Sequence, residues 1–235
     1  MGFSYERNLP HQSKAIDCVL LALKGARVEA ILNKSFNPKI SINDSNLSAN
    51  LRELQKRENI NSLHTLTRVF DICMETGTGK TYTYTKMALE LCKEFGLRKF
   101  IIIVPSLAIK ANTLNFLQAV ATREHFKSEF ELEIIANAIE AKKQAGKKSR
   151  KLMPNGLRDF IENDNPKEVH FLIINAQMLT ATSMNEDYEQ NLCDEFSNPY
   201  DALNAVNAVC IVDEPHRFDE TNKAWARIVN KTEKA

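Results

Sequence analysis

The stretch METGTGKT (74–81) has the residue types and the spacing that phosphate binding needs. Gly77 and Gly79 lack a Cβ, so the backbone around them can curl about a phosphate with its N–H groups pointing inward. Lys80 can reach the β and γ phosphates as a point charge, and the Thr81 hydroxyl can ligate Mg²⁺. A helix that begins at Lys80 would add its positive dipole end. The predicted nucleotide-binding residues are Thr76, Gly77, Thr78, Gly79, Lys80 and Thr81.

The stretch departs from the strict phosphate-loop pattern, GxxxxGK[ST], at its first position, where Met74 stands in place of glycine. The alternative interpretation is a glycine turn that arose by chance and binds nothing. We favour phosphate binding because an apolar run precedes the glycines and a helical pattern follows them. That is the structural context in which a phosphate loop occurs.

A second stretch, AVCIVDEPH (208–216), places Asp213 and Glu214 at the end of an apolar run. An acidic pair emerging from a buried strand is costly unless the carboxylates have partners. In phosphate-loop enzymes a strand-end aspartate holds Mg²⁺, and a neighbouring glutamate can orient or deprotonate the attacking water. An ordinary solvated strand end is the alternative. With both stretches present we predict Lys80, Asp213 and Glu214 as catalytic residues, Thr81 and Asp213 as metal ligands, and ATP with Mg²⁺ as cofactors.

The segments that would position these residues alternate between strands and helices. The predicted strands are continuous apolar runs, as in a parallel sheet covered on both faces; they are 67–74, 99–105, 132–136, 169–174 and 208–215. Helices are expected from their apolar periodicity and end signals at 11–32, about 47–54, 80–95, 107–119, 156–163, 199–206 and from about 221. Residues 33–46 are polar and read as a loop. The fold class is therefore α/β, an open sheet with helices on both faces, whose ligands bind beyond the carboxyl ends of the strands.

Composition excludes several classes of protein. Apolar residues make up 43% of the 235 residues, which supports a core, and the net charge of +1 gives no bulk attraction to nucleic acid. The five cysteines have no zinc spacing and fall mostly in apolar runs, as expected of reduced thiols in a cytoplasmic protein. No apolar run approaches the roughly 18 residues that span a bilayer, so no membrane association is expected. The basic stretch 142–151 is either a solvated loop or a phosphate-tracking patch, and we assign it no site.

METGTGKT and DEPH resemble motifs I and II of superfamily 2 helicases, in which the first glycine of the strict pattern is often missing. The longer forms METGTGKTYTYT and IVDEPHRF are most similar to the Res subunit of Type III restriction-modification enzymes. The resemblance extends from about Leu9 to Phe218, and it implies a RecA-like phosphate-loop domain. In the full-length protein it implies ATP hydrolysis coupled to translocation on double-stranded DNA and to cleavage. It also implies a DNA methyltransferase, the modification subunit, as partner.

The resemblance also implies further binding residues. NLPHQSKAI is similar to the element ahead of motif I whose glutamine, here Gln12, would read adenine; a solvent-facing glutamine at a helix start is the alternative. IIIVPSLAIK resembles motif Ia, and IINAQML resembles the next nucleic-acid-contacting motif. The candidate DNA contacts, which could equally be ordinary polar strand ends, are Pro105, Ser106, Lys110, Asn175 and Gln177.

The predicted domain organisation is a helical segment at 1–66, packed on a first RecA-like domain at 67–235. The family's second RecA-like domain, its arginine motif and its nuclease motif are not found, so a fragment with little turnover of its own is expected. Three alternatives remain open: another superfamily 2 motor such as a Type I restriction subunit or a repair helicase, a non-catalytic nucleotide-binding scaffold, and a small-molecule phosphotransferase.

Overall fold

The computed structural model describes residues 5–29, 31–60, 69–139, 155–179, 181–184, 186–189 and 191–218. The α-helices are α1 (Pro10–Ala22), α2 (Asp44–Glu58), α3 (Lys80–Phe95), α4 (Leu107–Gln118), α5 (Val120–Phe130), α6 (Asn155–Glu162), α7 (Ala176–Leu179) and α8 (Pro199–Ala205). The strands are β1 (Arg27–Glu29), β2 (Lys39–Ser41), β3 (Lys99–Val104), β4 (Glu133–Ala138), β5 (Glu168–Asn175) and β6 (Val209–Val212), and short 3₁₀ turns cover Thr182–Met184 and Pro215–Arg217.

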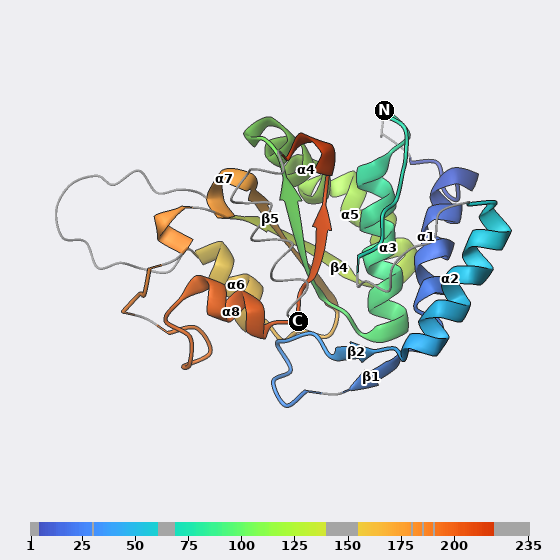
Figure 1. The fold of residues 1–235 in the computed structure, drawn as a ribbon. Coiled ribbons are helices and arrows are strands. Elements are labelled where there is room, and N and C mark those ends of the chain that lie inside the picture. The colour runs from blue at the N-terminus through green and yellow to red at the C-terminus, as the bar shows by residue number, and fades with distance from the viewer. Residues whose placement is uncertain are drawn as a thin grey trace.

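The centre of the molecule is a sheet of four parallel strands in the order β4-β5-β3-β6 (Figure 1). All six residues of β3 are buried, and all but the first residue of β5 are too. This is why both strands read as unbroken apolar runs in the sequence. Because the strands are parallel, Val104, Asn175 and Val212 all lie toward one edge of the sheet. Loops that follow these strands therefore meet at that edge.

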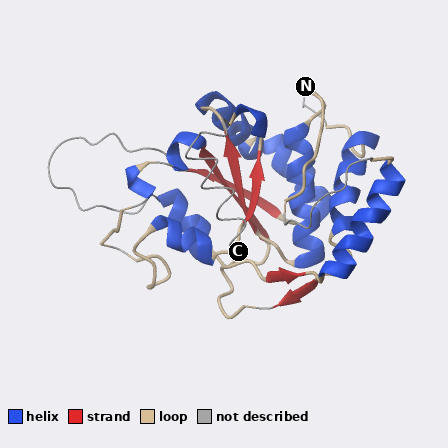
Figure 2. Cartoon of the chain, in the orientation of Figure 1, coloured by secondary structure: helices blue, strands red, loops and turns tan. Residues whose placement is uncertain are grey.

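Helices cover both faces of the sheet, and each face has its own core (Figures 1 and 2). Phe100, Ile102 and Val104 of β3 point into one core, which α1, α3 and α5 help to form. Ile101 and Ile103 point into the other core, which contains α6 and α8. The predicted α/β class with helices on both faces is confirmed. None of the helices within the described residues is long and apolar enough to cross a bilayer.

The N-terminal part differs from the expectation of one helix over 11–32. Helix α1 ends at Ala22, and Gly25 adopts a left-handed φ of 79° that turns the chain into β1. Strand β1 pairs antiparallel with β2, which lies inside the segment expected to be loop. Side chains of α1 nevertheless enter the first core, because Ile16 and Val19 pack there with the sheet residues. The division into two units at 66/67 stays a prediction.

The apolar run before the glycines does not form the predicted strand. Residues 69–75 have no regular structure, and Val69 and Ile72 are exposed. Strand β6 is the outermost strand on its side of the sheet, because no other strand among the described residues pairs with it there. A short apolar run shows a preference for extended backbone but does not specify a pairing partner, and Asp71 interrupts this one.

The other strand and helix predictions are confirmed to within a few residues. Helix α5 was not anticipated from the sequence. It follows α4 after the single residue Ala119, whose extended backbone separates the two helices. The helix expected from about 221 and the basic stretch 142–151 lie outside the described residues.

Candidate nucleotide-binding site

The glycine pair forms the turn that leads into α3. Gly77 and Gly79 both have φ of 83°, a left-handed conformation that favours glycine. The Thr78 hydroxyl donates to the Glu75 carbonyl at 2.6 Å and closes the turn. Gly79 is the N-cap of α3, and no side chain caps the first N–H groups of this helix. Uncapped N–H groups at the start of a sixteen-residue helix are suited to an anion.

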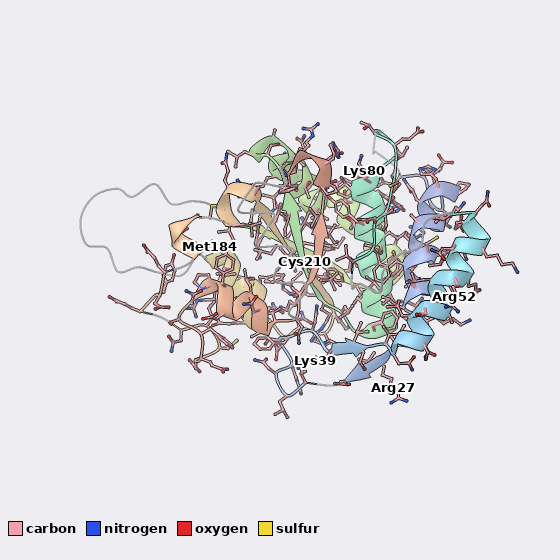
Figure 3. The ribbon with its side chains drawn as sticks, viewed as in Figure 1. Arg27, Lys39, Arg52, Lys80, Met184 and Cys210 are labelled. Atoms are coloured by element: carbon pink, nitrogen blue, oxygen red, sulfur yellow. The ribbon has the colours of Figure 1, made fainter. Side chains whose placement is uncertain are left out.

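The two stretches that carry the chemistry meet at one place. Lys80 Nζ lies 2.9 Å from Glu214 Oε1, although 134 positions separate the two residues in the sequence. The Lys80 side chain is 29% exposed and that of Glu214 is 17% exposed, so solvent reaches the pair. In Figure 3 Lys80 lies at the upper end of the molecule, opposite Arg27 and Lys39 of the β1–β2 ribbon. The structure therefore brings the two stretches together, and their action as one site stays a prediction.

The acidic pair follows β6 directly and is held by the sheet. The Asp213 N–H donates to the Ile103 carbonyl at 2.9 Å, which extends the pairing of β6 with β3 by one residue. Glu214 then turns away from the strand with a left-handed φ of 54°. Two basic side chains besides Lys80 lie near its carboxylate: His216 Nε2 is at 3.2 Å and Arg217 Nε is at 3.8 Å from Oε2.

The surroundings shift the two carboxyl groups in opposite directions. Burial, followed by the charge of Glu214, raises the pKa of Asp213 above its ordinary value. The hydrogen bond from Lys80 lowers the pKa of Glu214. Neighbouring carboxyl groups whose pKa values are pushed apart are typical of sites that divide labour between them. Glu214 is thus a stable anion, and Asp213 gains from a cation brought to it.

The residues at this edge fit a magnesium-bound triphosphate. The hydroxyl of Thr81 and the carboxylate of Asp213 are oxygen donors of the kind that Mg²⁺ prefers, and triphosphate oxygens commonly complete its shell. Space is available beside the loop, because a Cβ built on Gly77 would meet no atom within 4 Å. The N–H groups of the loop and the Lys80 ammonium can neutralise phosphate oxygens.

Gln12 lies against the phosphate loop. Its amide Nε2 donates to the Thr78 carbonyl at 3.1 Å, and His11 Nε2 lies 3.0 Å from the same oxygen. Gln12 is buried, and its Oε1 has no hydrogen-bond partner among the described residues. The amide also packs closely on Gly79, because a Cβ added there would lie 2.5 Å from Nε2. Its role in adenine recognition stays a prediction.

Sequence reasoning missed two neighbours of this site, His11 and Arg217. His11 adjoins Gln12 at the start of α1, where its contact with the loop depends on the fold and not on any spacing. Arg217 follows the acidic pair at i+3 from Glu214, a spacing at which side chains on a helical turn can meet. That spacing was the available signal.

Three of the candidate DNA contacts line a single hollow of about 490 Å³ between α4, β4 and α7. They are Lys110, Asn175 and Gln177. The Lys110 ammonium is buried and donates to the Ile139 carbonyl. Pro105 and Ser106 precede α4, and the Ser106 side chain caps this helix by accepting from the Ile109 N–H. The structure brings the five residues to one region, and their contact with DNA stays a prediction.

Comparisons with known proteins show which family and which proteins this chain is similar to. The family model described as Type III restriction enzyme, res subunit, matches residues 8–235. The Type III restriction-modification enzyme EcoPI Res subunit of Escherichia phage P1 is 41% identical over 97% of this chain and 24% of its own length. The EcoP15I Res subunit of Escherichia coli is 39% identical over the same shares. The StyLTI Res subunit of Salmonella typhimurium is 34% identical over 94% of this chain and 21% of its own length. The chain thus spans about a quarter of the length of these relatives.

Proposed function

Because the chain belongs to the family of Type III restriction enzyme Res subunits, we propose that it binds Mg²⁺–ATP as the first motor domain of a DNA translocase used in restriction. One observation carries the proposal. The ion pair between Lys80 and Glu214 joins the phosphate loop to the acidic strand end. A triphosphate on the loop would therefore lie beside both carboxylates.

Each residue has a distinct part in the proposed mechanism. Lys80 leaves Glu214 for the β and γ phosphates, because a phosphate offers it more negative charge than one carboxylate does. Thr81 and Asp213 would hold Mg²⁺, which would supply positive charge to neutralise the phosphate oxygens. Glu214, freed from Lys80, orients the attacking water and accepts its proton, and Gln12 pairs with the adenine edge.

The activity of the whole protein belongs to the same proposal. In this proposal, ATP hydrolysis drives movement on double-stranded DNA, which the region of Pro105, Ser106, Lys110, Asn175 and Gln177 contacts. A DNA methyltransferase subunit is the partner, and the complex acts in the cytoplasm. The names of the relatives, which are Res subunits of restriction-modification enzymes, support this assignment.

Isothermal titration of the chain with ATP in excess Mg²⁺ tests the proposal. We expect saturable binding with one site, and a loss of at least tenfold in affinity for Lys80→Ala. Lys93→Ala is the matched control, because Lys93 is an exposed lysine in the last turn of the same helix. Equal binding by the wild type and Lys80→Ala, or no heat of binding in the wild type, would refute the assignment of the site.

A further inference from the structure

A buried phenol, that of Tyr84, lies about one helical turn after Thr81, a proposed magnesium ligand. Tyr84 follows Thr81 by three positions on α3, so the two side chains share a helix face. The Tyr84 ring is buried in the first core. Its hydroxyl is directed to the hydroxyls of Thr81 and Thr113, and it is close enough to Asp213 to feel that charge.

The Tyr84 hydroxyl has no hydrogen bond of regular geometry within the described part of the chain, although it is fully shielded from water. A buried polar group without a partner costs free energy, so a phenylalanine at this position would pack at lower cost if packing alone mattered. Burial raises the pKa of this phenol to about 12, so it remains neutral and can both donate and accept. The hydroxyl can therefore link the Thr81 and Thr113 hydroxyls toward which it is directed.

We propose that Tyr84 is a positioning residue for Thr81, and that it links the metal ligand to α4 through Thr113. This inference rests on the function proposed above. A hydroxyl oxygen bound to a cation becomes a stronger donor. The Thr81 hydroxyl would then donate to the Tyr84 oxygen, which in turn would donate to Thr113. Such outer partners orient metal ligands and commonly account for 10- to 100-fold in metal affinity.

The connection has a consequence for α4. Thr113 is buried on this helix and follows Lys110 by three positions, and Lys110 lines the hollow that also contains Asn175. Helix α4 begins at the Ser106 cap, where the candidate DNA contacts gather. A metal ion held by Thr81 would thus bias the position of α4 through two hydroxyl groups. This is a direct physical path between the nucleotide end of α3 and the proposed DNA-contacting region.

The test compares Tyr84→Phe with Tyr82→Phe in the full chain. Both changes remove a tyrosine hydroxyl from α3, but the Tyr82 hydroxyl pairs with His125 and not with the site. The Kd for ATP is measured by titration with Mg²⁺ and again in EDTA. We expect Tyr84→Phe to weaken binding about tenfold with Mg²⁺ and to leave binding in EDTA unchanged. Tyr82→Phe should match the wild type in both conditions.

The outcomes separate this inference from the proposed function. If the wild type binds Mg²⁺–ATP and Tyr84→Phe binds it equally well, the positioning role is refuted while the proposed function stands. A loss that is the same with Mg²⁺ and in EDTA would also refute it, because a general distortion of α3 would then explain the effect. Absence of ATP binding by the wild type would overturn the proposed function and this inference with it.

Thr113→Val tests the second half of the path. Valine keeps the shape of threonine and removes the hydroxyl that would accept from Tyr84. We expect a loss of about two- to fivefold in affinity with Mg²⁺, smaller than that of Tyr84→Phe, and none in EDTA. Because the two changes interrupt one chain of hydrogen bonds, the double variant should lose no more than Tyr84→Phe alone. Additive losses would overturn the link to α4.

Discussion

Polar and charged groups gather at both ends of the central sheet, but solvent reaches those at one end and not those at the other. At the carboxyl ends of the strands, Lys80 and Glu214 pair within reach of solvent. At the amino ends, Lys99 and His170 are almost wholly buried, with 1% and 2% of their surface exposed. These two residues are register partners on β3 and β5, so they lie side by side on the same face of the sheet.

The buried end is held by the protein's own groups. The Lys99 ammonium donates to the Asn163 carbonyl at 2.7 Å and lies 5.6 Å from the centre of the Phe160 ring. Asn37 accepts from the backbone N–H of Lys99 and donates to its carbonyl, which fixes the start of β3. Burial lowers the pKa of Lys99 to about 8 and also lowers the pKa of His170, whose Nε2 lies 3.1 Å from Glu168.

The comparison shows that a shifted pKa does not by itself mark a functional site. Burial lowers the pKa of Lys99 to about 8, yet its ammonium faces a backbone carbonyl and an aromatic ring of the protein itself. Structural networks shift pKa values as readily as active sites do. What distinguishes the carboxyl end is a set of uncapped N–H groups beside a lysine that solvent reaches.

The largest expected effect comes from removing the same charge at each end. At an ATP concentration about 100-fold above the Kd, binding stabilises a protein by about 2.7 kcal/mol. Lys80→Met should lose this stabilisation, because its ammonium is the proposed phosphate contact. Lys99→Met should keep it in full, because Lys99 lies at the opposite edge of the sheet. Thermal unfolding with and without Mg²⁺–ATP measures both, and an equal loss in the two variants would break the comparison.

The second prediction concerns the cost of burying Lys99. Its pKa in the folded chain is about 8 against 10.5 when exposed, so the unfolded chain binds the proton more tightly. Stability should therefore rise as the pH increases from about 8 to 10.5, and the full cost should be present below pH 8. Lys99→Met should stabilise the chain by about 1–2 kcal/mol at pH 7. The same substitution should also remove the rise in stability at alkaline pH.

Urea unfolding at pH 7 and pH 10 measures the Lys99 effect, with Lys93→Met as an exposed control on α3. A destabilised Lys99→Met variant at pH 7 would show that the bonds to Asn163 and the contact with Phe160 outweigh the cost of burial. The buried end of the sheet would then be a net source of stability.

Much of the fold could be predicted from the sequence because the buried strands are unbroken apolar runs. The runs at 99–105 and 169–174 became β3 and β5, and glycine at 96 ends α3 with a φ of 72°. The run at 67–74 is also mostly apolar, although Asp71 interrupts it, and within its described part it pairs with no strand. Composition indicates extended backbone, whereas pairing depends on contacts distant in sequence. The same limit explains why the β1–β2 ribbon was missed.

The site was predictable where its chemistry lies within a single short stretch. The glycine turn, Lys80 and the acidic pair are local patterns, and they meet because α3 begins beside the end of β6. Gln12 was expected from a resemblance, but its contact with the Thr78 carbonyl was not. The position of Tyr84 beside Thr113 depends on how α3 and α4 lie relative to each other. The apolar periodicity of a helix does not predict its neighbours.

A third, smaller effect is expected from the two glycines of the loop. Both have φ of 83°, so alanine at either position costs about 1 kcal/mol in backbone strain. A Cβ at Gly77 would meet nothing within 4 Å, whereas one at Gly79 would lie 2.5 Å from Gln12 Nε2. Gly79→Ala should therefore destabilise the chain more than Gly77→Ala does, by about 0.5–1 kcal/mol. Urea unfolding measures the difference, and Gln12→Ala should abolish it because it removes the obstructing amide. A difference that persists in the Gln12→Ala background would show that Gln12 is not what restricts Gly79.

The smallest expected effect is a difference between the two ends of the sheet in how salt changes their contribution to stability. The pKa of Glu214 is lowered by Lys80, so the pair stabilises the chain above the ordinary glutamate pKa of 4.5, and this stability is lost as the pH falls through the lowered value. An ion pair that solvent reaches contributes about 0.2–1 kcal/mol, and about 1 M salt screens most of it. Glu214→Gln should therefore cost this amount at pH 7 in low salt and almost nothing in 1 M NaCl. The effect of Lys99→Met should be the same at both salt concentrations, because its surroundings exclude water and ions. A salt-independent cost for Glu214→Gln would mean that the Lys80–Glu214 pair is as shielded as the buried end, and the contrast between the two ends of the sheet would no longer hold.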